Sequence, residues 1–411
     1  MQHQHWLKNV RLETGIAKDG SLPATHTGLF DIAWTDGIIT TIQAASSDPV
    51  AASALNGQGL LAIPTLADYH IHIDKTYYGG PWIAPKPNPK GVLSRIEEEL
   101  TLLPKLLPTV KERANAMIDL YSRHGATKIR THTNVDPAIK LGNLERTLEA
   151  ISENQHRAEF EVVAFPQHGL LRSRSVDMID EAMRMGATHV GGVDPASIDG
   201  DIEKSLRTIF EIATRHGAAI DIHIHDGGHL GLFTMQRLAD LTRSNGYAGK
   251  VTVSHALGLA DISQQDAASL AEDFAELDIL ITSTVPLGRN VIPIPLLREH
   301  GVRVWLGDDS ITDHWSPFGK GDPLEKAGTL AERFRHQFFT EESLRSCLPH
   351  VTGGISPLNA EGEQVWPKVG DTASFLLVDA SCSAEAVARR SERRQLIYKG
   401  ISVWSRERGQ A

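Results

Sequence analysis

The chain repeats one pattern: a short run of β-branched and apolar residues ends in polar residues, and a longer stretch with helical spacing follows. Eight such runs occur: LLAIPTLADYHIHID, TKIRTHTNVD, EFEVVAFPQHG, THVGGVDPAS, AAIDIHIHDGG, KVTVSHALG, DILITSTVPLG and VRVWLGDDS. Each run has the length of a strand, while residues 202–217 have helical periodicity and end in a glycine typical of a helix C-terminus. Strands that alternate with helices in this way pair in parallel.

Eight strand–helix units predict an α/β fold, a (β/α)₈ barrel of the TIM type over residues 63–357. A doubly wound open sheet is the alternative, but it needs fewer strands and usually has a glycine-rich phosphate-binding turn. The sequence contains neither G-x-G-x-x-G nor G-x-x-x-x-G-K-[ST], which favours the barrel.

The two ends of the chain have a different pattern, with short apolar runs separated by Gly and Asp turns. They predict a small β-sandwich-like domain that residues 1–62 and 358–411 form together, since chain ends often lie close to one another. Residues 79–109 follow the first barrel strand, and we expect them to cover the mouth of the barrel.

Composition narrows the functional classes. The 411 residues are 41% hydrophobic and 22% charged, as in soluble globular proteins. A net charge of −10 argues against sequence-independent nucleic-acid binding and against docking on an anionic membrane. Cys347 and Cys382 do not form a C-x-x-C pair, the N-terminal stretch lacks the apolar segment of a signal peptide, and no apolar run is 18 residues long. We therefore expect a cytoplasmic protein.

Residue types that bind metals stand at the ends of four predicted strands. In a (β/α)₈ barrel the active site lies at the C-terminal ends of the strands. His70 and His72 share one face of the first strand, because alternate residues of a strand point to the same side. His223, His255 and Asp309 end the fifth, sixth and eighth strands. Each residue alone has a structural interpretation, but three of these imidazoles and the carboxylate, in one place, predict a site for Zn²⁺ or Fe²⁺.

The motifs at these strand ends resemble the amidohydrolase superfamily, in the branch that holds cytosine deaminase and N-isopropylammelide amidohydrolase. The similar motifs span nearly the whole chain: HIHIDK at 70–75, RTHTNVD at 130–136, VVAFPQHG at 162–169, VGGVDPA at 190–196, DIHIHDGG at 221–228, VTVSHA at 251–256 and GDDSITDHWSPFGKGD at 307–322.

The resemblance implies specific roles. His70, His72, His223 and Asp309 are the implied ligands of one divalent ion, with His255 beside the attacking water and the reacting carbon. A single ion is favoured because binuclear members bridge their ions with a lysine after the fourth strand, where this chain has none. Lys75 is then expected to be a supporting residue.

A second group of residues is expected at the substrate. Gln167 is the implied hydrogen-bonding partner of the substrate ring, and His225, Ser310 and Trp315 are expected nearby. Cytosine deaminase has Glu where this chain has Asp226, and Asp where it has Ser310. Asp226 is therefore the expected proton donor to the ring nitrogen, and capping of the following helix is its alternative role.

The sequence leaves two alternative roles for each of four further residues. His132 and His168 line the pocket or form local hydrogen bonds, and Trp82 and Trp315 line the pocket or only pack.

The predicted activity is hydrolytic deamination of an amino-substituted pyrimidine or triazine, in which a metal-activated water attacks the ring carbon and ammonia leaves. Asp309, His255 and Asp226 are the expected catalytic residues. Hydrolysis of another C–N bond, in an N-alkylamino heterocycle or a cyclic amide, is the second hypothesis, and a non-catalytic metal- or ligand-binding barrel is the third. The expected partner is a small heterocycle, with no nucleic acid and no membrane. The sequence does not decide between a monomer and a homo-oligomer.

Overall fold

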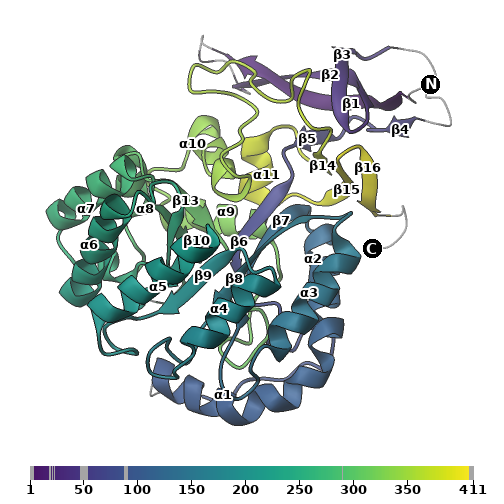
Figure 1. Cartoon of the computed structure of the whole chain (residues 1–411). Coiled ribbons are helices and arrows are strands. Elements are labelled where there is room, and N and C mark those ends of the chain that lie inside the picture. Colours follow the sequence, from purple (N-terminus) through teal and green to yellow (C-terminus); the bar gives the residue numbers. More distant parts are fainter. Residues whose placement is uncertain are drawn as a thin grey trace.

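The computed structural model describes residues 4–17, 20, 22, 24–46, 54–87, 91–288 and 290–406. Its central feature is an eight-stranded parallel sheet in which neighbouring strands follow chain order (Figure 1). The strands are β6 (Leu66–Ile71), β7 (Ala126–Asn134), β8 (Glu159–Phe165), β9 (His189–Val193), β10 (Ala219–His223), β11 (Val251–Ser254), β12 (Leu280–Ser283) and β13 (Val304–Leu306). Each lies at or within one residue of a predicted run, which confirms the barrel and excludes the doubly wound alternative.

The first and last strands meet, so the sheet is nearly closed. Ile71 and Asp309 form a parallel bridge, and the backbone amide of His72 donates to the carbonyl of Asp309 at 3.0 Å. Gly307 allows this approach, because a Cβ there would lie 2.6 Å from the backbone nitrogen of His70. Closure of the barrel therefore brings the first and last strand ends, with their polar residues, side by side.

Helices surround the barrel (Figure 1). They are α1 (Val92–Leu106), α2 (Val110–Arg123), α3 (Gly142–Asn154), α4 (Val176–Met185), α5 (Ile202–His216), α6 (Gly228–Ser244), α7 (Gln264–Glu276), α8 (Ile294–Glu299) and α9 (Pro323–Arg333), with α10 (Glu341–Arg345), α11 (Ser383–Arg389) and 3₁₀ turns at Leu107–Thr109, Leu257–Ala260 and Leu348–Val351. Helix α5 begins where the Asp201 carboxylate accepts from the amide of Lys204, and ends at Gly217, whose φ of 63° is left-handed, as predicted.

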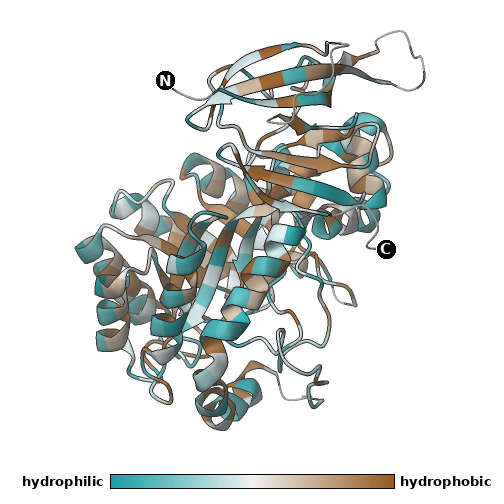
Figure 2. Ribbon diagram, turned by 90° about the vertical axis from the view of Figure 1, so that its right-hand side faces the viewer, coloured by the Kyte–Doolittle hydropathy of each residue, from teal (hydrophilic) through white to brown (hydrophobic). Residues whose placement is uncertain are grey.

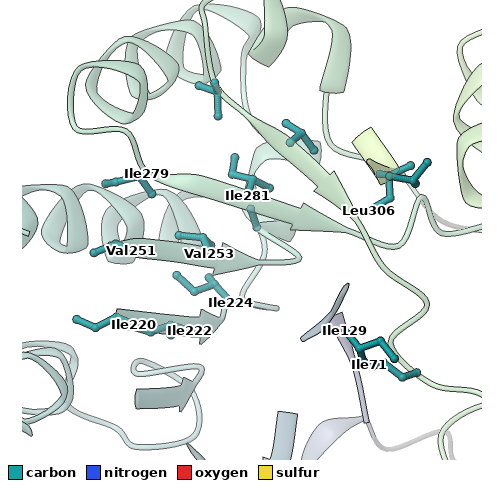
Figure 3. Packing of buried hydrophobic residues seen from close by; sticks show 14 of the residues in the cluster. Ile71, Ile129, Ile220, Ile222, Ile224, Val251, Val253, Ile279, Ile281 and Leu306 are labelled. Carbon is teal, nitrogen blue, oxygen red and sulfur yellow. The ribbon is translucent and has the colours of Figure 1, made fainter. Parts of the chain in front are cut away.

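Strand side chains alternate between the helices and the barrel interior. On β10, Ile220 and Ile222 belong to the apolar core, while Asp221 and His223 are buried among polar groups. Figure 3 shows the apolar members of several strands packed in this core. Because the period of a strand is two, one strand packs apolar side chains against the helices and carries polar side chains into the barrel interior.

Both ends of the chain contribute to a second eight-stranded sheet, as predicted. Its strands are β1 (His5–Ile16), β2 (Thr25–Thr35), β3 (Ile38–Ala44), β4 (Leu55–Asn56), β5 (Leu61–Ile63), β14 (Phe375–Val378), β15 (Arg393–Tyr398) and β16 (Ile401–Ser405). The N-terminal and C-terminal halves lie one above the other (Figure 2), and a buried cluster that includes Trp34, Phe375 and Ile397 takes residues from both. The sheet lies at the opposite end of the molecule from α1 (Figure 1).

Among the described residues, no helix is long and apolar enough to cross a membrane. Cys347 and Cys382 are buried and are not disulfide-bonded.

Candidate metal centre and substrate cavity

Five side chains converge at the C-terminal ends of the barrel strands. One carboxylate oxygen of Asp309 lies 3.4 Å from Nε2 of both His70 and His72, and its other oxygen lies 4.0 Å from Nε2 of His255. Ligand-type atoms of His70, His223, His255 and Asp309 all lie within 4.8 Å of one another. The structure thus places three of the four predicted ligands, His70, His223 and Asp309, in one group with His255. The fourth, His72, is not in that group, but its Nε2 lies 3.4 Å from the Asp309 carboxylate.

The donor set fits a divalent cation. Both ring nitrogens of His223 and Nε2 of His255 are buried with no hydrogen-bond partner in the described part of the chain. Burial, with neighbouring histidines, lowers the pKa of His223 and His255 well below the ordinary value, and burial lowers that of His72 as well. Neutral imidazoles with buried, unpaired nitrogens are suited to bind a metal, which would compensate their loss of hydration.

Hydrogen bonds on the far side of the rings orient His70 and His72. Nδ1 of His72 lies 2.9 Å from the carbonyl oxygen of His132, and Nδ1 of His70 lies 2.8 Å from the hydroxyl of Ser254. Ser254 in turn donates to the buried Asp221 at 2.6 Å. With Nδ1 of each ring bound in this way, Nε2 faces the centre of the cluster.

The backbone is strained at two of the converging residues. His255 has a φ of 71° and Asp309 a φ of 64°, both in the left-handed region that non-glycine residues rarely adopt. Backbone hydrogen bonds hold them there. The amide of His255 donates to the carbonyl oxygen of Thr282 at 2.9 Å, and the amide of Asp309 donates to the carbonyl oxygen of His70 at 2.6 Å. Strain of this kind is typical of functional sites, where surrounding contacts fix a costly conformation.

Burial alone would raise the pKa of Asp309, but the adjacent rings of His70, His72 and His255 hold it well below the ordinary value. The group is therefore an anion in the described structure, as a metal ligand must be.

A small cavity opens beside the cluster and contains most of the predicted substrate residues. Its lining residues are His72, Lys75, Gln167, His223, His225, Asp309, Ser310 and Trp315. Trp315 is thus pocket lining, whereas Trp82 is 68% exposed and is not among the lining residues. His132 and His168 are buried and do not line the cavity: His132 stacks on His70 with ring centroids 4.0 Å apart, and His168 binds Glu99.

Asp226 and His225 differ in position although they are adjacent. His225 lines the cavity, and the Asp194 carboxylate accepts from its amide at 2.6 Å and lies 2.8 Å from its Nδ1. Asp226 is half-buried, is not among the lining residues, and does not cap α6, whose N-cap is Gly227. Burial raises the pKa of Asp226, and a hydrogen bond with Ser197 opposes the shift.

Several residues of the site were not found from the sequence. Glu99 and His314 are fully buried next to Lys75 and Trp315, and Asp194 supports His225. Glu99 had a detectable signal, because it lies three residues after Ile96 and four before Leu103, on the buried face of α1.

Comparisons with known proteins agree with this geometry. Residues 54–404 match the model of the Amidohydrolase family. The chain is 42% identical over 404 residues to the uncharacterized protein YahJ of Escherichia coli, covering 97% of this chain and 87% of that protein. The crystal structure of N-isopropylammelide isopropylaminohydrolase from Burkholderia multivorans superposes with a TM-score of 0.85 at 31% identity, covering 98% and 99% of the two chains. That of 5-methylcytosine deaminase from Klebsiella pneumoniae has a TM-score of 0.79 at 25% identity, covering 99% and 98%.

Proposed function

Because the chain belongs to the amidohydrolase family and is therefore a hydrolase, we propose that it removes an amino group from a nitrogen heterocycle, with water as the nucleophile and ammonia as the product. A cytosine-like pyrimidine or a triazine is the proposed substrate class. The observation that carries the proposal is the cluster of His70, His223, His255 and Asp309, whose ligand atoms lie within 4.8 Å of one another beside a cavity lined by Gln167.

The proposed cofactor is one divalent ion, Zn²⁺ or Fe²⁺, held by His70, His72, His223 and Asp309. When bound, such an ion supplies hydroxide at neutral pH, because it lowers the pKa of water towards ~7. The buried unpaired nitrogens described above support this assignment.

Metal analysis is expected to find one tightly held ion per chain. Strand β9 ends at Val193 without a lysine, so no bridging ligand for a second ion is available there. Elemental analysis of purified protein, before and after dialysis against a chelator, measures this number. Two ions per chain, both required for activity, would contradict the prediction.

The side chains around the cavity are proposed to divide the proton transfers. Asp309, an anion, accepts the proton of the attacking water. His255 donates a hydrogen bond to the oxygen that gains charge at the attacked carbon. Asp226, whose pKa is raised, protonates the ring nitrogen that receives the electron pair. Asp309 passes the proton taken from water to the amino group, the C–N bond breaks and ammonia leaves. The proton of the new hydroxyl group returns to Asp226, and a ring carbonyl remains.

Replacement of His255 by Ala is expected to lower kcat by roughly 10²–10³, the effect of one lost donor to a developing oxyanion. Metal content is expected to stay near one per chain, because His70, His72, His223 and Asp309 remain. Steady-state kinetics together with metal analysis test this. Full activity in the variant would remove His255 from the mechanism, and loss of the metal would instead make it a ligand.

A coupled ammonia assay of the metal-loaded protein tests the function itself. The panel comprises cytosine, its 5-substituted and iso forms, ammeline-type triazines, pterins and creatinine. The Asp309→Asn variant, purified in parallel, controls for a contaminating deaminase. Absence of ammonia release from every compound, at verified metal occupancy, would contradict deamination.

Hydrolysis of an N-alkylamino heterocycle is the second candidate. The similarity to N-isopropylammelide isopropylaminohydrolase over 98% of this chain favours it. Release of an alkylamine rather than ammonia, detected by mass spectrometry with N-alkylated triazines, would identify this reaction.

A further inference from the structure

Glu99 of α1 is a fully buried carboxylate with an unusual number of donors around it. Oε1 accepts from Nε2 of His314 at 2.8 Å, from the indole of Trp315 at 3.1 Å and from Nζ of Lys75 at 3.4 Å. Oε2 lies 3.0 Å from Nε2 of His168 and accepts from Nδ2 of Asn134 at 3.3 Å. These partners lie at or after the ends of four different barrel strands, β6, β7, β8 and β13, so one side chain joins segments from around the mouth of the barrel.

Two of these partners line the substrate cavity. Lys75 and Trp315 do so, and Nζ of Lys75 also lies 5.5 Å from the centroid of the Trp315 ring. Burial alone would raise the pKa of Glu99, but Lys75 and hydrogen bonds from His168 and His314 hold it well below the ordinary value. The anion therefore stands behind the cavity wall without lining it.

The contact with Lys75 has a consequence for Gln167. An ammonium group only donates hydrogen bonds, and Nζ of Lys75 donates to Oε1 of Gln167 at 2.8 Å. The amide oxygen of Gln167 is thus turned to Lys75, which leaves its NH₂ group as the donor available to a molecule in the cavity.

We propose that Glu99 is a positioning residue for substrate binding: from α1 it holds Lys75 and Trp315 at the cavity wall, and through Lys75 it fixes which end of the Gln167 amide meets the substrate. Building on the proposed function, the heterocycle must present an acceptor, a ring carbonyl or an unprotonated ring nitrogen, to Gln167.

Chemical labelling tests the hold on Lys75 without any substrate. Native protein is acetylated with an amine-reactive ester, and the modification of Lys75 is measured by peptide mass spectrometry. Glu99→Gln is expected to label roughly 10- to 100-fold faster at Lys75 than the wild type, since loss of a charged hydrogen bond favours local opening by that factor. Glu97→Gln is the matched control, because it removes the same charge from an exposed position of α1.

Kinetics test the effect on binding. For a substrate found by the ammonia assay, Glu99→Gln is expected to raise KM roughly tenfold or more, while kcat and metal content change little. A merely structural role would instead lower the active fraction, and so kcat, at constant KM. Equal Lys75 labelling in the Glu99→Gln and Glu97→Gln variants would overturn the proposal, and so would faster labelling with unchanged KM.

Two outcomes need separate readouts. If Glu99→Gln does not fold, Glu99→Asp, which keeps the charge on a shorter side chain, replaces it. Lys75 is expected to be acetylated about 3- to 10-fold faster in this variant than in the wild type. Acetylation of Lys75 at the wild-type rate would overturn the proposal. If no heterocycle is hydrolysed by the wild type, the proposed function fails, and the labelling still decides whether Glu99 holds Lys75.

Discussion

Replacing Asp309 by Asn is expected to reduce turnover roughly 10³-fold or more. An amide can neither balance the charge of a divalent ion nor accept the proton of water, so the variant loses a ligand and a base together. The carboxylate is also the point at which His70 and His72 meet, each at 3.4 Å. The measurements are kcat/KM with the best substrate of the ammonia panel and the metal content per chain.

Asp240→Asn is the matched control for this variant. Asp240 lies on the outer part of α6 with its side chain 54% exposed, so the same chemical change there is expected to leave activity and metal content unaltered. If Asp309→Asn kept a tenth of the wild-type activity, another group would have to take the proton from water.

Replacing Asp226 by Asn is expected to lower kcat by a factor of about 10²–10⁴, with metal content unchanged. The physical reason is that Asn cannot protonate the ring nitrogen. Because burial raises the pKa of Asp226, the acid form persists to higher pH than for an ordinary aspartate. Wild-type kcat is therefore expected to fall as pH rises through this raised pKa, and that limb of the pH profile is expected to disappear in the variant.

Asp226→Glu provides the companion measurement. The added methylene moves the carboxyl by roughly 1 Å, enough to change reacting geometry and hence the preference among ring substrates. Kinetics on three or four heterocycles compare the two variants. Near wild-type turnover in Asp226→Asn would reassign the proton transfer, and His225, which lines the cavity, would be the next candidate.

The barrel and the meeting of its candidate metal ligands could be predicted from sequence because both depend on local order. A strand has a period of two, so alternation within AAIDIHIHDGG separates Ile220 and Ile222 from Asp221 and His223 before any fold is known. Parallel strands also present all their C-terminal ends on one side. Residues far apart in the chain, such as His70 and Asp309, were therefore expected at one place, and the structure brings them there.

The supporting residues could not be predicted in this way, because their partners come from unrelated parts of the chain. Helical spacing places Glu99, and not Glu97 or Glu98, on the buried face of α1. Only the packing of α1 against the barrel determines that its partners there are Lys75, His168 and His314.

The directions of the Asp226 and His225 side chains could not be predicted from the sequence either. Both follow His223 on one strand end, and both were expected at the substrate, with Asp226 as the proton donor that the resemblance implies. Only the tertiary structure decided that His225, braced by Asp194 from the neighbouring strand, lines the cavity while Asp226 lies half-buried outside its lining. Local periodicity determined which strand ends carry the chemistry, whereas the direction of each side chain beyond the strand depended on loops whose course is set by contacts between distant segments.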